Sequence, residues 1–152
     1  MFTIPSIPPL DENAAQAAMQ RQNQLTKPTG SLGKLESLSA QIAGCSGKAS
    51  PSVSEKAVIV MAADHGITAE GISAYPAEVT PQMVFNFLSG KAAINVLSKQ
   101  SNAAVRIVDI GVNYDFPDHP LLIKRKIRKG TRNFATETAM TIEETQRAIE
   151  IG

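Results

Sequence analysis

Two short apolar runs separated by a helical pattern constrain the fold of this chain more than any other feature. Residues 57–62 form a continuous apolar run bounded by polar sequence, as in a strand buried on both faces of a parallel sheet. Residues 105–110, of which four are apolar, predict a second strand. Between them, apolar residues recur at helical spacing over residues 80–98, with Thr80 as the expected N-cap and Pro81 as the first helical residue. Strand, helix and strand in one sheet predict a right-handed βαβ crossover and a core of the α/β class.

The residues before the first strand predict two helices. The first ten residues are expected to be an extended arm because they contain three prolines: Pro5, Pro8 and Pro9. Asp11 can cap a helix running to about residue 25, and the loop over residues 26–30 ends it. A second helix is predicted from Ser31 to about Gly44, which suits the C′ position. Its apolar stripe consists of Leu32, Leu35, Leu38 and Ile42.

The density of glycine, serine and proline over residues 44–54 is typical of a linker. We therefore expect a helical arm and small-domain hairpin over residues 1–46, and the N-terminal half of a larger α/β domain over residues 47–152. A third apolar stretch, 121–127, alternates with basic residues and predicts an edge strand or a hairpin arm with a solvated basic face. A capping box over residues 141–144 predicts a final helix. Two or three strands are too few for a doubly wound sheet, so the parallel sheet is expected to be incomplete in this chain.

Composition narrows the class of partner. Fifteen basic residues against fourteen acidic ones give a net charge of +1, which favours neither nucleic acid nor a membrane surface, so a small-molecule partner is expected. The single Cys45 excludes an internal disulfide, and no spacing of Cys and His predicts a metal site or a cofactor. The N-terminus lacks the pattern of a signal peptide, and no run is long enough to span a membrane. These features predict a cytoplasmic protein.

The first candidate site is Asp64-His65-Gly66, directly after the first strand. In open α/β sheets, ligands bind outside the carboxyl ends of the strands, so Asp64 and His65 are expected at the edge of the sheet where ligands usually bind. A structural role is equally consistent with the pattern. In that case Asp64 accepts hydrogen bonds from backbone amides, His65 packs as a satisfied polar residue, and Gly66 permits a turn.

The second candidate is the loop over residues 71–83, which joins the first strand to the following helix. Among its residues, Tyr75 can stack on a flat heteroaromatic ring, Met83 can conform to a ring face, and Gln82 offers both a donor and an acceptor. Such residues suit an apolar pocket with few polar anchors. From this pattern alone, ordinary core positions around a structured loop are the better explanation of Tyr75 and Met83.

Three further segments carry weaker signals. Residues 25–36 combine a glycine turn with Lys27 and Lys34 at a helix start, which could hold an anion, although a helix-hairpin turn with surface lysines explains the pattern better. Residues 109–113 suit either ligand approach or an ordinary turn. Residues 129–134 form a basic loop that could bind an anion, although a loop of solvated basic side chains is the commoner explanation.

Five segments together resemble a known family. LTKPTGSLGKLE, VIVMAADHGI, SAYPAEVTPQMVFNFLSGKAAINVL, VDIGV and KIRKGTRNFATETAMTIEE occur in the order and spacing of the nicotinate-nucleotide:dimethylbenzimidazole phosphoribosyltransferases. The resemblance covers the chain from about Leu25 to Gly152. It implies transfer of a phosphoribosyl group from nicotinate mononucleotide to 5,6-dimethylbenzimidazole, giving α-ribazole 5′-phosphate and nicotinate, a step of cobalamin lower-ligand synthesis.

By the same resemblance, the loop from Ser73 to Met83 would wall the benzimidazole pocket. The substrate-binding residues expected from the two candidate sites and the resemblance are Asp64, His65, Ser73, Tyr75, Gln82 and Met83. Family members resemble homodimers with a large Rossmann-like domain and a small helical domain built from both chain ends. Residues 47–152 would then be the N-terminal half of the α/β phosphoribosyltransferase domain.

The chain also departs from the family. Family enzymes are roughly twice as long, and their general base, a glutamate, and their glycine-rich phosphate-binding segment would lie beyond Gly152. No catalytic residue is therefore expected in this chain. Glu78 is better explained by capping or ion pairing, and Glu143, Glu144 and Glu150 are expected to be solvated. The alternative is a non-catalytic benzimidazole-binding fragment or subunit that needs a separate C-terminal half.

Overall fold

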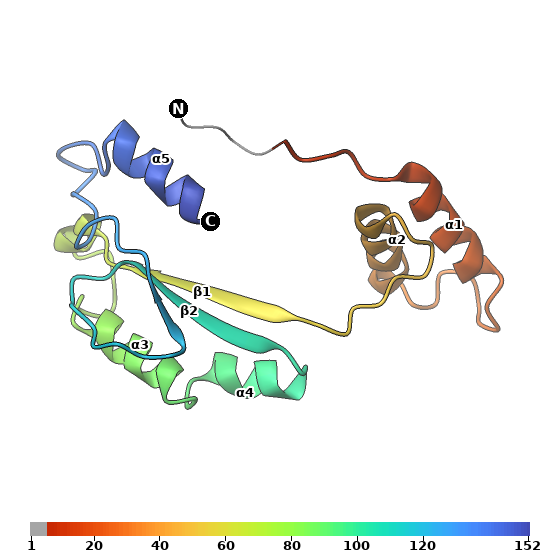
Figure 1. Cartoon of the computed structure of the whole chain (residues 1–152), viewed down its shortest axis with the longest axis horizontal. Helices are drawn as coiled ribbons and strands as arrows, with labels where there is room; N and C mark the ends of the chain where they lie inside the picture. The colour runs from red at the N-terminus through yellow and green to blue at the C-terminus, as the bar shows by residue number, and fades with distance from the viewer. Residues whose placement is uncertain (1–5) are drawn as a thin grey trace. The chain divides into compact units, whose positions relative to one another are not determined.

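The computed structural model describes residues 6–152 and divides into two compact units between Ser54 and Glu55. Residues 6–54 form a helical unit, and residues 55–152 form a unit built on a sheet (Figure 1). Residues 1–5 of the predicted arm, which include Pro5, lie outside the described residues.

The helical unit consists of α1, Glu12–Asn23, and α2, Lys34–Ser46. Asp11 is the N-cap of α1 as predicted, and its Oδ1 atom accepts a hydrogen bond of 2.9 Å from the N–H of Ala14. The predicted end of the second helix at Gly44 is wrong. Gly44 lies inside α2, where its carbonyl oxygen accepts a hydrogen bond from the N–H of Asp11, and the left-handed C-cap is Gly47.

The face that α2 buries also differs from the prediction. The stripe of Leu32, Leu35 and Leu38 is exposed within the described residues, and the buried positions of the hairpin are small or charged: Ala14, Ala18, Glu36, Ala43 and Gly44. The reason is the close approach of the two helices. An added Cβ at Gly44 would lie 3.4–3.5 Å from atoms of Leu10, Asp11 and Ala15, which leaves no space for leucines between the helices.

An ion pair holds the loop between the two helices. The Nζ atom of Lys27 lies 2.6 Å from the Oε1 atom of Glu36, and both side chains are largely buried. The same oxygen accepts a hydrogen bond from the N–H of Leu32. The hydrogen bond from Lys27 lowers the pKa of Glu36, and the hydrogen bond from Leu32 adds to this. Lys27 is therefore paired within the hairpin, which agrees with the expected helix-hairpin turn and not with an anion site that uses this lysine.

Lys27→Met is expected to lower the thermal midpoint of unfolding at neutral pH, because it removes the counter-ion of Glu36. Since the pKa of Glu36 is lower in the folded chain, the pair stabilises the fold above the ordinary glutamate pKa of 4.5, and this is lost as the pH falls through the folded value. The variant's midpoint should therefore depend less on pH in that acidic window. Circular dichroism across the window measures both effects. Lys34→Met, which removes a lysine without an ion pair in the described residues, should behave as wild type.

The larger unit contains a three-stranded parallel sheet in the order β1-β2-β3. Its strands are β1, Ala57–Ala63; β2, Ala104–Gly111; and β3, Leu122–Lys124. The predicted α/β class and both apolar strands are confirmed. The third apolar stretch is an edge strand rather than a hairpin arm, because it runs parallel to β2.

The single helix predicted between β1 and β2 is wrong, because two helices occupy this segment: α3, Val79–Leu88, and α4, Ala93–Gln100. The break lies at Gly90, which has a φ of 74° that other residues rarely adopt. The apolar pattern continues across the break, so periodicity alone does not detect it. Helix α3 begins at Val79 without a side-chain cap, so the predicted N-cap at Thr80 is also wrong.

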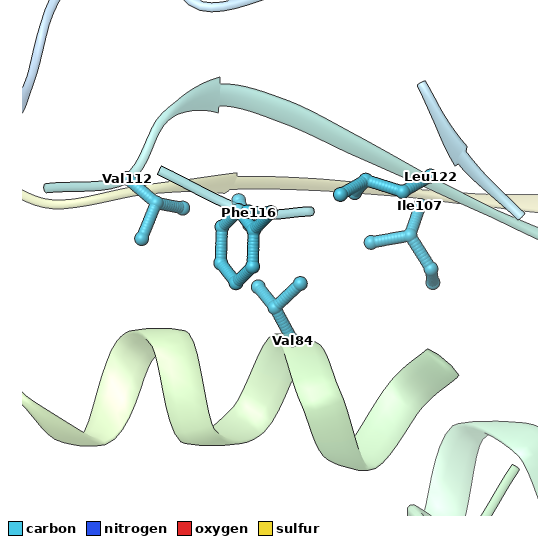
Figure 2. Close-up of a cluster of buried hydrophobic side chains, with 6 residues drawn as sticks. Val84, Ile107, Val112, Phe116 and Leu122 are labelled. Carbon is cyan, nitrogen blue, oxygen red and sulfur yellow. The ribbon is translucent and has the colours of Figure 1, made fainter. Parts of the chain in front are cut away.

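The core lies between the sheet and α3. Val84 points from α3 toward Ile107 and Leu122 of the strands and toward Val112 and Phe116 after β2 (Figure 2). Helices α3 and α4 lie on one side of the sheet, and α5, Ile142–Ile151, lies on the other (Figure 1). The prediction that β1 is buried on both faces is wrong, since Ile59 is 61% exposed in the described chain. No described helix covers that part of the strand.

The final helix, α5, begins as predicted with a capping box. The Thr141 Oγ1 atom accepts a hydrogen bond from the N–H of Glu144, and the Glu144 carboxylate accepts one from the N–H of Thr141. The prediction that Glu144 is solvated is wrong. Its carboxylate also pairs with Arg132 at 3.1 Å and lies 3.8 Å from Arg128. These ion pairs connect helix α5 to the segment that follows β3.

Candidate functional site

A cavity of about 380 Å³ opens at the carboxyl end of β1, beside α3. Its volume lies in the range of small-molecule pockets. It includes five of the six residues predicted to bind substrate: Asp64, His65, Ser73, Tyr75 and Met83. Gln82 is exposed and is not among the lining residues. Residues from β1, from the loop after it and from α3 therefore meet at one site, as the sequence predicts for all but one of them.

The cavity combines apolar walls with a polar rim. Residues of β1 and α3 form its apolar part: Val60, Ala62, Met83, Val84 and Phe87. The loop contributes Ser73 and Tyr75, and Tyr75 is 71% exposed. The Ser73 hydroxyl donates to the carbonyl oxygen of Tyr75 and accepts from its N–H, which stabilises the turn that presents the ring. This arrangement suits a flat, largely apolar heteroaromatic ligand.

Asp64 is buried and mainly ties segments together. Its Oδ2 atom accepts a hydrogen bond of 2.7 Å from the N–H of Asn113, 49 residues along the chain. Its own N–H donates to the carbonyl oxygen of Gly111, and its carbonyl oxygen accepts from the N–H of Thr131. The carboxylate therefore accepts from a backbone amide while lining the cavity, which favours the structural role for this side chain. His65 is exposed rather than packed, so it is the more accessible polar group.

Gly66 begins a short 3-10 helix, η1, Gly66–Glu70, and lies against the loop that follows β3. Its N–H donates to the carbonyl and hydroxyl oxygens of Thr131, at 3.1 and 3.2 Å. A Cβ at this position would lie 2.6 Å from backbone atoms of Arg132 and Asn133. Gly66 therefore permits a close backbone approach rather than a turn, which corrects the expected reason for glycine here.

A family model described as phosphoribosyltransferase matches residues 7–152, which is nearly the whole chain. The chain belongs to this phosphoribosyltransferase family.

Named relatives agree with this assignment. Over 150 residues, the chain is 57% identical to the nicotinate-nucleotide–dimethylbenzimidazole phosphoribosyltransferase of Chloroflexus aggregans, covering 99% of this chain and 42% of the relative. It is 52% identical to the enzyme of the same name from Geobacter sp. strain M21, with coverage of 98% and 43%. The chain thus spans less than half the length of these curated relatives.

A solved structure supports the fold. The crystal structure of the Thermus thermophilus protein of that name superposes with a TM-score of 0.85 at 50% sequence identity, covering 91% of this chain and 42% of the other. A second structure of the T. thermophilus protein, described as CobT, gives a TM-score of 0.83. The α/β fold of this phosphoribosyltransferase chain is therefore that of its structural relatives.

The basic residues after β3 in the phosphoribosyltransferase chain are mostly paired. The predicted solvated basic face is wrong for Lys126, which is half-buried and lies 3.0 Å from the Oδ2 atom of Asp109. Asp109 is only 1% exposed, so its carboxylate requires a cation nearby. Lys129 pairs with Asp115, and Arg132 pairs with Glu144. In the loop over residues 129–134, Arg132 is therefore held by a partly buried ion pair, whereas both partners of the Lys129–Asp115 pair are exposed.

Sequence reasoning missed several lining residues of this cavity. Val60, Ala62 and Phe87 look like ordinary core positions in the sequence, yet they line the cavity. The available signal was their place on the inward face of the strand and helix that flank the pocket loop. Within residues 6–152, no group of three His, Cys, Asp or Glu side chains could hold a metal ion. No helix of that same part is long and apolar enough to cross a membrane.

Proposed function

We propose that this chain forms the base-binding part of an enzyme that transfers phosphoribosyl from nicotinate mononucleotide to 5,6-dimethylbenzimidazole, giving α-ribazole 5′-phosphate and nicotinate. The observation that carries the proposal is the cavity at the end of β1, whose apolar walls and polar rim match a flat azole base. The names of the relatives, 57% and 52% identical to this chain, point to the same substrates. On this proposal five of the six expected residues, Asp64, His65, Ser73, Tyr75 and Met83, form the binding site, with Tyr75 and Met83 contacting the ring.

The reaction requires a ring nitrogen of the base to attack the ribose C1′ atom while nicotinate leaves, and the ring N–H proton must pass to a base. Glu78 and the other glutamates of the described chain do not line the cavity. On this proposal the chain supplies binding and orientation of the azole, and we assign the proton acceptor and the phosphate site to the part of the relatives' length that the chain does not span.

Tyr75→Ala is expected to weaken the binding of 5,6-dimethylbenzimidazole roughly tenfold, since one aromatic contact is worth about 1–1.5 kcal/mol. Isothermal titration calorimetry of the purified chain measures this. Gln82→Ala should weaken binding much less, because Gln82 does not line the cavity.

Gln100→Ala, at the exposed end of α4, is the matched control and should leave the affinity unchanged. Equal affinity of the wild-type and Tyr75→Ala chains would place the base elsewhere. A folded wild-type chain that binds no base would contradict the proposal that the described residues alone form the pocket.

The second candidate function is a non-catalytic benzimidazole-binding fragment or subunit that works with a separate C-terminal half. The two candidates differ in whether the C-terminal half belongs to the same polypeptide. A reading frame that continues into that half supports the first, and a C-terminal half encoded as a separate polypeptide supports the second. Nicotinate release from nicotinate mononucleotide that is restored when a separately purified C-terminal half is added to the chain would show that two polypeptides can form the active enzyme.

We further propose a homodimer located in the cytoplasm. The exposed apolar face of β1, with Ile59 and Met61, and the unpaired edge of that strand in the described sheet favour self-association. Sedimentation velocity should show a dimer whose fraction rises with concentration, and Ile59→Lys should shift the chain toward monomer. A wild-type chain that stays monomeric at every concentration would contradict the dimer.

A further inference from the structure

Lys126 lies where three segments meet at the carboxyl end of β2. Its ammonium group is 3.0 Å from the Oδ2 atom of Asp109 and donates hydrogen bonds to the carbonyl oxygens of Val112, at 2.6 Å, and Tyr114. The Oδ1 atom of Asp109 accepts a hydrogen bond from the N–H of Val112. One lysine therefore neutralises a buried carboxylate and holds both ends of the turn over residues 112–114.

This turn contacts two walls of the cavity at the end of β1. The N–H of Asn113, at its centre, donates to the carboxylate of Asp64, which lines the cavity. The ring of Tyr114 packs edge-on against Phe85 of α3, with ring centroids 5.7 Å apart. Helix α3 also carries Met83 and so presents part of the cavity wall. The turn thus connects the end of β1 with α3.

We propose that Lys126 is a positioning residue for the base pocket. It does not line the cavity. It acts by holding the turn over residues 112–114, which in turn fixes the carboxylate of Asp64 and the packing of α3. Sites of this kind depend on supporting groups that lock the residues in contact with the ligand. The inference rests on the proposed base-binding function, and it adds a residue that neither the loop nor the strand motif indicates.

The test requires a variant that folds. Lys126→Met alone would leave the carboxylate of Asp109 buried without a counter-ion, which is strongly destabilising. The double variant Asp109→Asn with Lys126→Met removes both charges, and a neutral replacement of a buried ion pair is usually tolerated. The asparagine oxygen can still accept from the N–H of Val112. Lys126→Arg keeps the cation, and Lys129→Met removes a neighbouring exposed lysine that pairs with Asp115.

Two measurements then decide the proposal, namely amide hydrogen exchange at Asn113 and affinity for 5,6-dimethylbenzimidazole. In the double variant, exchange at Asn113 should accelerate roughly tenfold and the affinity should fall roughly fivefold, the range expected for changes that act on a site through its supports. Amides in the middle of β2 should keep their protection. The single variant Lys126→Arg should keep the exchange rate at Asn113 and the affinity for the base near their wild-type values. Lys129→Met should change neither.

Unchanged exchange at Asn113 in the double variant would overturn the proposal, whether or not the base binds. Faster exchange with wild-type affinity would also overturn it, because the turn would then not control the pocket. If exchange accelerates while even the wild-type chain binds no base, the proposed base-binding function fails. In that case the result still supports the claim that Lys126 stabilises the hydrogen bond between Asn113 and Asp64.

Discussion

Asp109→Ala is expected to lower the free energy of unfolding of the sheet-containing unit by about 3–5 kcal/mol, the cost of removing one partner of a buried ion pair. The side chain of Asp109 is almost wholly buried. Its loss leaves the half-buried ammonium of Lys126 without this counter-ion and the N–H of Val112 without its acceptor. Urea denaturation followed by circular dichroism measures the change.

Asp115→Ala is the matched control, because Asp115 is an exposed aspartate that also neighbours Lys126, at 3.9 Å. Exposed ion pairs contribute little to stability, so this variant should unfold close to the wild-type midpoint. A similar loss in both variants would show that the buried position of Asp109 has no special importance. A negligible loss in Asp109→Ala would contradict the role assigned to the pair.

Gly66→Ala is expected to lower the free energy of unfolding by about 1–3 kcal/mol, as overpacking does, and to weaken base binding at the same time. The added Cβ would lie 2.6–2.7 Å from three backbone atoms of residues 131–133, and backbone cannot move aside as a flexible side chain can. The shift would disturb the hydrogen bonds between Gly66 and Thr131, next to the cavity residues Asp64 and His65. Denaturation and calorimetry on the same preparation measure both losses.

Gly44→Ala provides a comparison at a glycine where the closest atom to an added Cβ is 3.4 Å away. Because Gly44 lies inside α2, alanine there should leave stability unchanged or raise it by about 0.5–1 kcal/mol. Wild-type stability and affinity in Gly66→Ala would show that the loop after β3 moves away freely. The close approach would then have no bearing on the pocket.

Features set by neighbouring residues could be predicted from the sequence. The caps at Asp11 and Thr141 depend on residues three positions away, and both are confirmed. The two apolar strands and their parallel pairing follow from the same kind of local pattern together with the crossover rule. Five of the six expected binding residues share one cavity because they follow a single strand along the chain, through the loop after it and into α3.

Features that depend on distant contacts could not be predicted. Lys126 and Glu144 look like surface charges until Asp109 and Arg132 are placed beside them. The exposed leucine stripe of α2 has a helical period as good as that of a buried face, and only the tight packing of α1 near Gly44 shows which face is covered. The break at Gly90 was missed for a different reason, since the apolar period runs through it and one left-handed residue ends the helix.

The parallel pairing of β1 with β2 has a consequence for the order in which this unit folds. Ala57 pairs with Ala104 and Met61 with Val108, so the register is set only after the chain between the strands has closed on itself. Non-local parallel pairing of this kind is slow. The hydrogen bond from Asn113 to Asp64, and the approach of Thr131 to Gly66, can form only once that register exists. These pocket contacts therefore cannot precede the pairing of β1 with β2, and α3 and α4 formed alone would lack them.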